Sequence, residues 1–225
     1  AAPCYSCQFY EVYNERIRDL LDAADAERTR KVHVHPEHGV SVEGVAVSAV
    51  SAPEEALGLL SLGNQARAVA ATTLNARSSR SHAIFIFKFE DGCGPGSHRE
   101  STVTFVDLAG REDQQASQNR AVHFREMTYI NKSLFHLAHL ISKLSEGHVE
   151  RGSLSDFRNS KLTLLLSQAL VGNSQTALVA TVAPLRSFFE DSAATLAFAQ
   201  SLGRLRTRPA VNDRSPRSVI RELEA

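Results

Sequence analysis

Hydrophobic and polar positions alternate at the start of the chain. The segment CQFYEVY is aromatic and alternating, which is typical of a β-strand. After a turn near Asn14, the spacing of Ile17, Leu20 and Leu21 predicts a helix. Valines then alternate across residues 32–42, on both sides of a Pro-Glu-His-Gly sequence, and this arrangement predicts a β-hairpin.

One helix and two strands are predicted in the centre of the chain. Ser51 and Glu54 have capping-box spacing, and Gly63 suits the end of the helix that they begin. The next strand has Phe85, Phe87 and Phe89 on one face and Ile84 and Ile86 on the other, and apolar side chains on both faces indicate a covered central strand. The segment STVTFVDLAG supplies a second buried strand, and the glycine-rich turn before it predicts a hairpin of the two strands.

Helices dominate the second half of the chain. Apolar side chains step by three and four between Phe124 and Gly147, so a long amphipathic helix is expected. NSKLTLLLSQALVG predicts another helix that ends at Gly172, and TALVATVAP predicts a buried strand closed by its proline. A last helix starts with capping-box spacing at Ser187 and Glu190. Strands interleaved with helices predict an α/β layered sheet.

Composition restricts the class of protein. The 225 residues include 25 Lys+Arg and 25 Asp+Glu, so the formal net charge is zero, and 43% of the residues are hydrophobic. These values exclude a disordered chain and a globally basic protein that binds nucleic acid. Only five of the basic residues are Lys, and the arginine bias suits forked contacts with carboxylates or phosphates.

Cysteines and histidines give little support for a metal or redox site. Three cysteines are too few for a disulfide framework and favour a reducing compartment. Cys4 and Cys7 form a single CxxC, for which free thiols are preferred over structural zinc or thiol chemistry. His33, His35 and His38 suggest a metal site, but no Cys or carboxylate completes the set, so a solvated face is preferred. No apolar run is long enough to span a membrane, and a cytoplasmic location is expected.

The second central strand is expected to end in residues that suit nucleotide chemistry. FVDLAG places Asp107 and Gly110 at the carboxyl edge of a sheet, where α/β proteins bind ligands. In nucleotide hydrolases such an Asp holds Mg²⁺ and such a Gly N–H contacts the γ-phosphate, although turn chemistry alone also places Asp and Gly after strands. The nearby NARSSRSH strengthens the nucleotide hypothesis, because its hydroxyls and a guanidinium can contact metal, phosphate and a carboxylate such as Glu112.

Together these segments resemble the kinesin motor domain over nearly the whole chain. FYEVYNERIRDLL, NARSSRSH, DLAGRE, INKSL and FRNSKLTLLLSQALVGNSQTALVATVAP occur in the order of that family. The resemblance implies an α/β, P-loop-NTPase-like layered sheet with helices on both faces, incomplete at its N-terminal part. It implies a partial motor domain over residues 1–205, followed over residues 206–225 by a neck-linker-like segment and the start of a helix.

By this resemblance, residues Asn75 to His82 form switch I. Asn75 belongs to the nucleotide-binding motif, and Ser78 lies near the γ-phosphate. Ser79 is a ligand of Mg²⁺, and Arg80 is the switch arginine. The implied substrate is ATP, bound together with Mg²⁺.

Switch II is then the segment from Asp107 to Glu112. Asp107 resembles the acid on the Mg²⁺ side, which acts through water, and Gly110 resembles the γ-phosphate sensor. Glu112 would close a salt bridge with Arg80 when ATP is bound.

The resemblance also implies a surface that binds microtubules. The helix that carries NKSL is similar to the family's relay helix, in which Glu126 and Asn131 match positions of the motif, and Asn131 and Lys132 are expected to face the microtubule. Arg158 and Lys161 match family residues that face tubulin, whose acidic surface attracts basic side chains. A solvated helix end is the alternative interpretation of these two residues.

Three features depart from the family pattern. The phosphate loop GxxxxGK[ST] is absent, so the chain is expected to begin after it, with roughly the first third of a motor head missing and a strand edge unpaired. Arg111 stands where the family usually has Ser, and it could compete with Arg80 for Glu112. Leu164 occupies the position of a family Arg, which is expected to alter the affinity for microtubules.

Two hypotheses follow. In the first, the chain is part of an ATP-driven motor associated with the cytoskeleton, and a second kinesin chain is a possible partner through a stalk. In the second, it is a motor-like module that binds microtubules without hydrolysing ATP. The sequence RPAVN, in the place of a neck linker, hints at plus-end movement.

Overall fold

The computed structural model describes residues 4–22, 28–35, 39–73, 80–91, 99–110, 122–148, 154–207 and 209. The chain divides into two compact units. The first, here the sheet unit, comprises residues 1–31, 42–130 and 211–225. The second, here the helical unit, comprises residues 32–41 and 131–210.

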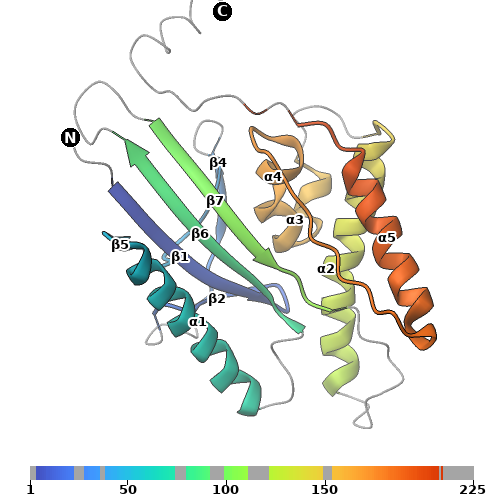
Figure 1. The fold of residues 1–225 in the computed structure, drawn as a ribbon, viewed down its shortest axis with the longest axis horizontal. Coiled ribbons are helices and arrows are strands. Elements are labelled where there is room, and N and C mark those ends of the chain that lie inside the picture. The colour runs from blue at the N-terminus through green and yellow to red at the C-terminus, as the bar shows by residue number, and fades with distance from the viewer. Residues whose placement is uncertain are drawn as a thin grey trace, which may run out of the picture. The chain divides into compact units, whose positions relative to one another are not determined.

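An antiparallel sheet forms the centre of the sheet unit (Figure 1). Its described strands are β1 (Cys4–Tyr13), β2 (Arg16–Asp19), β5 (Ser48–Val50), β6 (His82–Asp91) and β7 (Arg99–Asp107). They follow the order β2-β1-β6-β7, and β5 pairs with β1 as well. The sequence prediction of a hairpin from β6 and β7 is confirmed, and so is the central place of β6.

Aromatic side chains of three strands meet on one face of this sheet. Phe85 of β6 lies opposite Phe9 of β1 and Phe105 of β7 in the ladder. The Phe9 and Phe85 rings pack edge to face with centroids 5.4 Å apart, inside a buried cluster that also contains Cys7 and Leu20. Aromatic pairs of this geometry add to the stability that burial gives.

The prediction that β7 is buried is wrong. Val103 is 51% exposed and Phe105 is 60% exposed, although both lie opposite phenylalanines of β6. In the described part of the chain β7 pairs only with β6, so it is an edge strand. Its apolar sequence is typical of a covered strand, but no described element covers it.

The helix predicted after Asn14 is also wrong, because the chain turns back there as β2. Asn14 and Glu15 have φ of 50° and 57°, both in the left-handed region. A two-residue turn with two positive φ values matches the twist of a β-hairpin, and Asn tolerates this conformation well. The resulting pairing places Ile17 opposite Val12 and buries both side chains.

Helix α1 (Pro53–Thr73) packs against β1 and β5 (Figure 1). It continues through Gly63, where the sequence predicted its end. A Cβ at Gly63 would overlap the ring of Phe9, so this glycine permits a close approach of helix and sheet. The capping box predicted from Ser51 and Glu54 is wrong too. The Ser51 N–H donates its hydrogen bond to the carboxylate of Glu55, at 2.7 Å, and not to that of Glu54.

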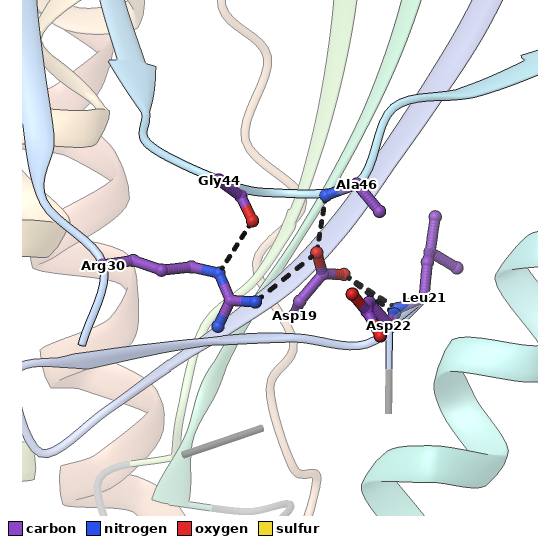
Figure 2. A network of polar contacts seen from close by, with 6 residues as sticks. All are labelled: Asp19, Leu21, Asp22, Arg30, Gly44 and Ala46. Carbon is purple, nitrogen blue, oxygen red and sulfur yellow. Dashed lines mark hydrogen bonds and ion pairs between the residues drawn. The ribbon is translucent and has the colours of Figure 1, made fainter. Parts of the chain in front are cut away.

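A buried carboxylate joins separate segments of the sheet unit (Figure 2). Asp19 Oδ1 accepts a hydrogen bond from the Leu21 N–H at 2.9 Å, and Oδ2 accepts one from the Ala46 N–H at 2.6 Å. Arg30 Nη2 lies 3.9 Å from the same Oδ2, and its Nε donates to the Gly44 carbonyl at 3.3 Å. The side chains of Asp19 and Arg30 are fully buried, so each compensates the charge of the other.

The helical unit combines a small ladder with several helices. Strands β3 (Val32–His35) and β4 (Gly39–Val42) pair as the predicted hairpin, and α3 packs against β3. The long predicted helix is confirmed as α2 (Val122–Ser145), most of which belongs to this unit. The remaining elements are the 3-10 helices η4 (Asp156–Asn159) and η5 (Arg186–Phe188) and the helices α3 (Lys161–Leu165), α4 (Ser167–Val171) and α5 (Phe189–Gly203).

Two of the elements predicted for this unit are wrong. The segment TALVATVAP forms no strand, and Val179 within it is 90% exposed. A strand needs a neighbour for its backbone hydrogen bonds, and no described strand pairs with this segment. The predicted helix over NSKLTLLLSQALVG is divided at Leu166 into α3 and α4.

The capping box predicted at Ser187 and Glu190 does not form, because α5 begins after Phe188 without a side-chain cap. In the part of the chain that the structure describes, no helix combines the length and the apolar character that crossing a membrane requires.

We expect Gly63→Ala to destabilise the protein. The new methyl group would overlap Phe9, and overpacking of this kind costs about 1–3 kcal/mol, more than the roughly 1 kcal/mol gained in helix propensity. Gly58→Ala in the same helix is the matched control, because a Cβ there meets no neighbouring atom. Urea unfolding measures both variants, and a Gly63→Ala protein as stable as Gly58→Ala would contradict the packing.

Candidate functional site

The start of β6 and the end of β7 lie at the same edge of the sheet. Antiparallel pairing places Ala83 opposite Asp107 in the last register position of this ladder. Arg80 precedes β6, and Gly110 follows β7. The ladder therefore brings together the described parts of the two segments that the sequence analysis singled out.

Arg67 of α1 contacts both segments at this edge. Its Nη1 lies 3.1 Å from Asp107 Oδ2, and its Nη2 donates to the carbonyl and the hydroxyl of Ser81, each at 3.4 Å. The Arg67 side chain is largely buried, whereas that of Asp107 is 72% exposed, so solvent screens this ion pair from the side of the carboxylate. A single guanidinium thus ties the end of β7 to the residue before β6.

His82 makes a second connection across the same edge. Its Nδ1 accepts a hydrogen bond from the Ala109 N–H at 3.0 Å, so this nitrogen carries no proton. The pKa of His82 is lowered to about 4, mainly because the ring is buried; the charge of Asp107 opposes this shift, and that of Arg67 adds to it. His82 is therefore neutral at pH 7.

The structure describes only part of the predicted nucleotide set. Arg80 is half-buried, Gly110 is exposed and the Asp107 side chain is 72% exposed, all at the edge described above. The other members, Asn75, Ser78, Ser79 and Glu112, lie outside the described residues, and so does Arg111.

Sequence reasoning missed Arg67 and the role of His82. One signal for Arg67 was available: it follows Gly63 by four residues, so a helix extended past that glycine would place both on one face. His82 was included only as the last residue of a motif. Arg67 and His82 contact residues that are distant in sequence, and local patterns therefore did not indicate these contacts.

A metal or disulfide site finds no support in the described residues. No group of three or more His, Cys, Asp or Glu side chains there could hold a metal ion. Cys4 is exposed and Cys7 is buried. Of the three histidines considered, His33 and His35 lie on β3, and His38 is outside the described residues.

The residues expected to face microtubules belong to the helical unit. Lys132 of α2 and Arg158 of η4 are exposed, and Lys161 at the start of α3 is half-buried. The side chain of Asn131 is outside the described part of the chain. Leu164, in the place of the family arginine, is half-buried in α3.

A compact turn holds Arg158 and Lys161 in place. Phe157 and Thr163 are completely buried on either side of the junction between η4 and α3. Ser160 caps α3 by accepting a hydrogen bond from the Thr163 N–H at 3.1 Å, and the Thr163 hydroxyl donates to the Phe157 carbonyl at 2.7 Å. The two basic residues are therefore presented by a rigid turn.

The pKa of His82 predicts a specific dependence of stability on pH. Its pKa is about 4 in the folded protein against an ordinary value of 6.5, so below pH 6.5 the unfolded chain binds the proton more readily. Stability from this residue is complete above pH 6.5 and is lost as the pH falls toward 4. We expect His82 to remove about 2 kcal/mol of stability between pH 7 and pH 5.

Urea unfolding of the protein and of His82→Asn, compared at several pH values, measures this contribution. Asn has no titrating group and keeps an acceptor oxygen, so the difference between the two proteins should change with pH. A difference that stays constant from pH 7 to pH 5 would contradict the low pKa.

Comparisons with known proteins agree with the motifs. The family model described as "Kinesin motor domain" matches residues 3–205. The chain is 37% identical over 228 residues to the human "Kinesin-like protein KIF14" and 37% identical over 222 residues to the mouse "Kinesin-like protein KIF13A". Each alignment covers 96% of this chain, which spans 14% of the human protein and 13% of the mouse protein.

Two solved structures have the same fold. One is a KIF14 dimer in a two-heads-bound state with AMP-PNP, in complex with a microtubule, and the other is described as a fast kinesin. Both superpose with a TM-score of 0.82 at 34% identity. The matches cover 99% and 96% of this chain, and 64% and 60% of the chains in those structures. The predicted α/β fold of the P-loop-NTPase type is thereby confirmed, and the chain belongs to the kinesin motor-domain family.

Proposed function

We propose that this chain supplies the switch and microtubule-binding parts of an ATP-driven microtubule motor. The observation that carries the proposal is the connection between its two switch segments, in which Ala109 donates a hydrogen bond to His82 at 3.0 Å. A nucleotide-dependent motor requires such segments to respond together to the γ-phosphate. Membership of the kinesin family supports this assignment.

Hydrolysis would use the residues at the end of the sheet where β6 begins and β7 ends. In this proposal the Gly110 N–H contacts the γ-phosphate, and Arg80 pairs with Glu112 once ATP is bound. The closed pair would orient the water that attacks phosphorus, and nearby donors would stabilise the charge that develops on the phosphate oxygens. Asn75 and Ser78 would complete the phosphate contacts of switch I.

Asp107 fits the role of a carboxylate on the metal side. Arg67 Nη1 lies 3.1 Å from its Oδ2, and the Asp107 side chain remains largely open to solvent. An exposed carboxylate at a strand end can hold a Mg²⁺-bound water, and Ser79 would be a direct ligand. Bound Mg²⁺ would neutralise charge on the phosphates, while Arg67 keeps the carboxylate in position.

Microtubule binding would involve α2 and the turn between η4 and α3. Asn131, Lys132, Arg158 and Lys161 are the proposed contacts, and an acidic partner suits the three basic side chains. The matched KIF14 structure is a dimer on a microtubule, which supports a cytoskeletal location and a second kinesin chain as partner. We further propose residues 1–205 as motor domain and residues 206–225 as a neck-linker-like segment.

A second function, microtubule binding without ATP hydrolysis, is favoured by one observation. The phosphate-loop pattern GxxxxGK[ST] does not occur in these 225 residues, and that loop normally supplies the backbone cradle and the lysine for the phosphates. Arg111 beside Glu112 adds to this possibility, because it offers the carboxylate another partner.

Turnover of MgATP distinguishes the two functions. The 225-residue chain and a longer polypeptide that carries a kinesin phosphate loop upstream are assayed with and without microtubules. We expect turnover, stimulated by microtubules, only from the longer polypeptide, because it alone has the phosphate cradle. Absence of turnover from both proteins, with microtubule binding retained, would favour the binding module.

Variants of the longer polypeptide test the proposed switch pair. Glu112→Ala and Arg80→Ala should each abolish microtubule-stimulated turnover while nucleotide binding persists, since the pair acts after ATP is bound. Unchanged turnover in either variant would exclude the salt bridge.

Microtubule cosedimentation tests the proposed basic contacts. Arg158→Ala combined with Lys161→Ala should weaken binding about three- to tenfold at low salt, and less at high salt, because salt screens exposed charges. Arg186→Ala combined with Arg204→Ala, two exposed arginines of the same unit, is the control with the same change in charge. Equal weakening by both pairs would mean that net charge, rather than this turn, determines binding.

A further inference from the structure

We propose that His82 is a positioning residue that holds the Ala109 peptide, so that the next N–H, that of Gly110, is fixed for the γ-phosphate. This inference rests on the proposed ATPase function. It assigns a specific task to a side chain that would otherwise count only as part of the core.

The backbone at Ala109 needs a partner that the sheet does not supply. The ladder between β6 and β7 ends at the pair Ala83 and Asp107, so Ala109 lies beyond the last register position. Ala109 is nevertheless buried, and a buried N–H without an acceptor is costly. The 3.0 Å bond to His82 Nδ1 replaces the missing backbone pairing.

The imidazole is itself held firmly. His82 is only 2% exposed, and its backbone pairs with Val12 of β1. The preceding residue, Ser81, is bound by Arg67, which also contacts Asp107 two residues before Ala109. Both ends of the His82–Ala109 bond are therefore anchored by neighbouring groups.

The effect would reach Gly110 through one peptide unit. Gly110 is exposed, and the direction of its N–H is set by the preceding Ala109 peptide and the ψ angle of Ala109. Fixing the Ala109 peptide restricts the directions available to the next N–H, which lowers the cost of placing it for a phosphate oxygen. The hydrogen bond needs an acceptor at Nδ1, which only the neutral imidazole offers.

Two substitutions at His82 distinguish the effect of the hydrogen-bond acceptor from the effect of the space that the ring fills. His82→Asn places Oδ1 at the same number of bonds from Cα as Nδ1, so it keeps an acceptor. His82→Leu fills similar space without one. The two variants are therefore a matched pair for the hydrogen bond.

Amide hydrogen exchange of the 225-residue chain, without nucleotide, tests the bond itself. In His82→Leu the Ala109 amide should exchange about tenfold faster, while the amides of Phe85 and Val103 in the ladder stay unchanged. His82→Asn should retain slow exchange at Ala109. Slow exchange at Ala109 in the Leu variant would overturn the proposal.

A measurement on the unmodified chain is independent of how the variants fold. In ¹⁵N NMR at pH 7, His82 should show a protonated Nε2 and an unprotonated Nδ1 that is coupled to the Ala109 amide. The opposite tautomer would overturn the proposal.

Turnover in the longer polypeptide tests the positioning role. His82→Leu should lower kcat about tenfold with little change in the KM for ATP, and His82→Asn should restore most of kcat. Faster exchange at Ala109 with unchanged kcat would show a structural bond only and would overturn the role. If the unmodified longer polypeptide shows no turnover, the ATPase proposal fails, and the exchange result still reports separately whether the bond exists.

Discussion

The register between β6 and β7 determines which chemical groups meet in the sheet unit. Side chains of a strand alternate between faces, so a slip of one residue in this ladder would turn Phe105 to the face opposite Phe85. The same slip would separate Asp107 from Ala83 and move Ala109 away from His82. The geometry of the candidate site therefore depends on this ladder, whereas the packing of Phe9 against Phe85 depends on the ladder between β1 and β6.

Charged and polar groups in the interior of this unit serve to connect segments. Asp19 binds backbone amides and Arg30, and Arg67 binds a carboxylate and a carbonyl, so the buried charges have compensating partners. His82 needs no compensating charge, because burial lowers its pKa and the ring remains neutral at pH 7. Loss of one partner from such a network is costly, whereas the more exposed pair of Lys143 and Asp156 in the helical unit contributes little.

Local sequence patterns predicted the elements whose stability is local. The β6–β7 hairpin, the β3–β4 hairpin and α2 follow from alternation and helical spacing, and the hairpin prediction places Asp107 opposite the start of β6. The failures involve contacts between distant parts of the chain. Gly63 looked like a helix end because Phe9, its actual neighbour, is far away in the sequence. TALVATVAP has the composition of a buried strand, but composition cannot supply a pairing partner.

The exposed edge strand β7 has a consequence for how this protein behaves in solution. Val103 and Phe105 present apolar side chains beside backbone groups that no described strand pairs, and such edges promote pairing between molecules. Self-association would then increase with protein concentration and carry material into a pellet without any filament present. Sedimentation of this chain measures affinity for a polymer only when the same concentration, spun alone, remains in the supernatant.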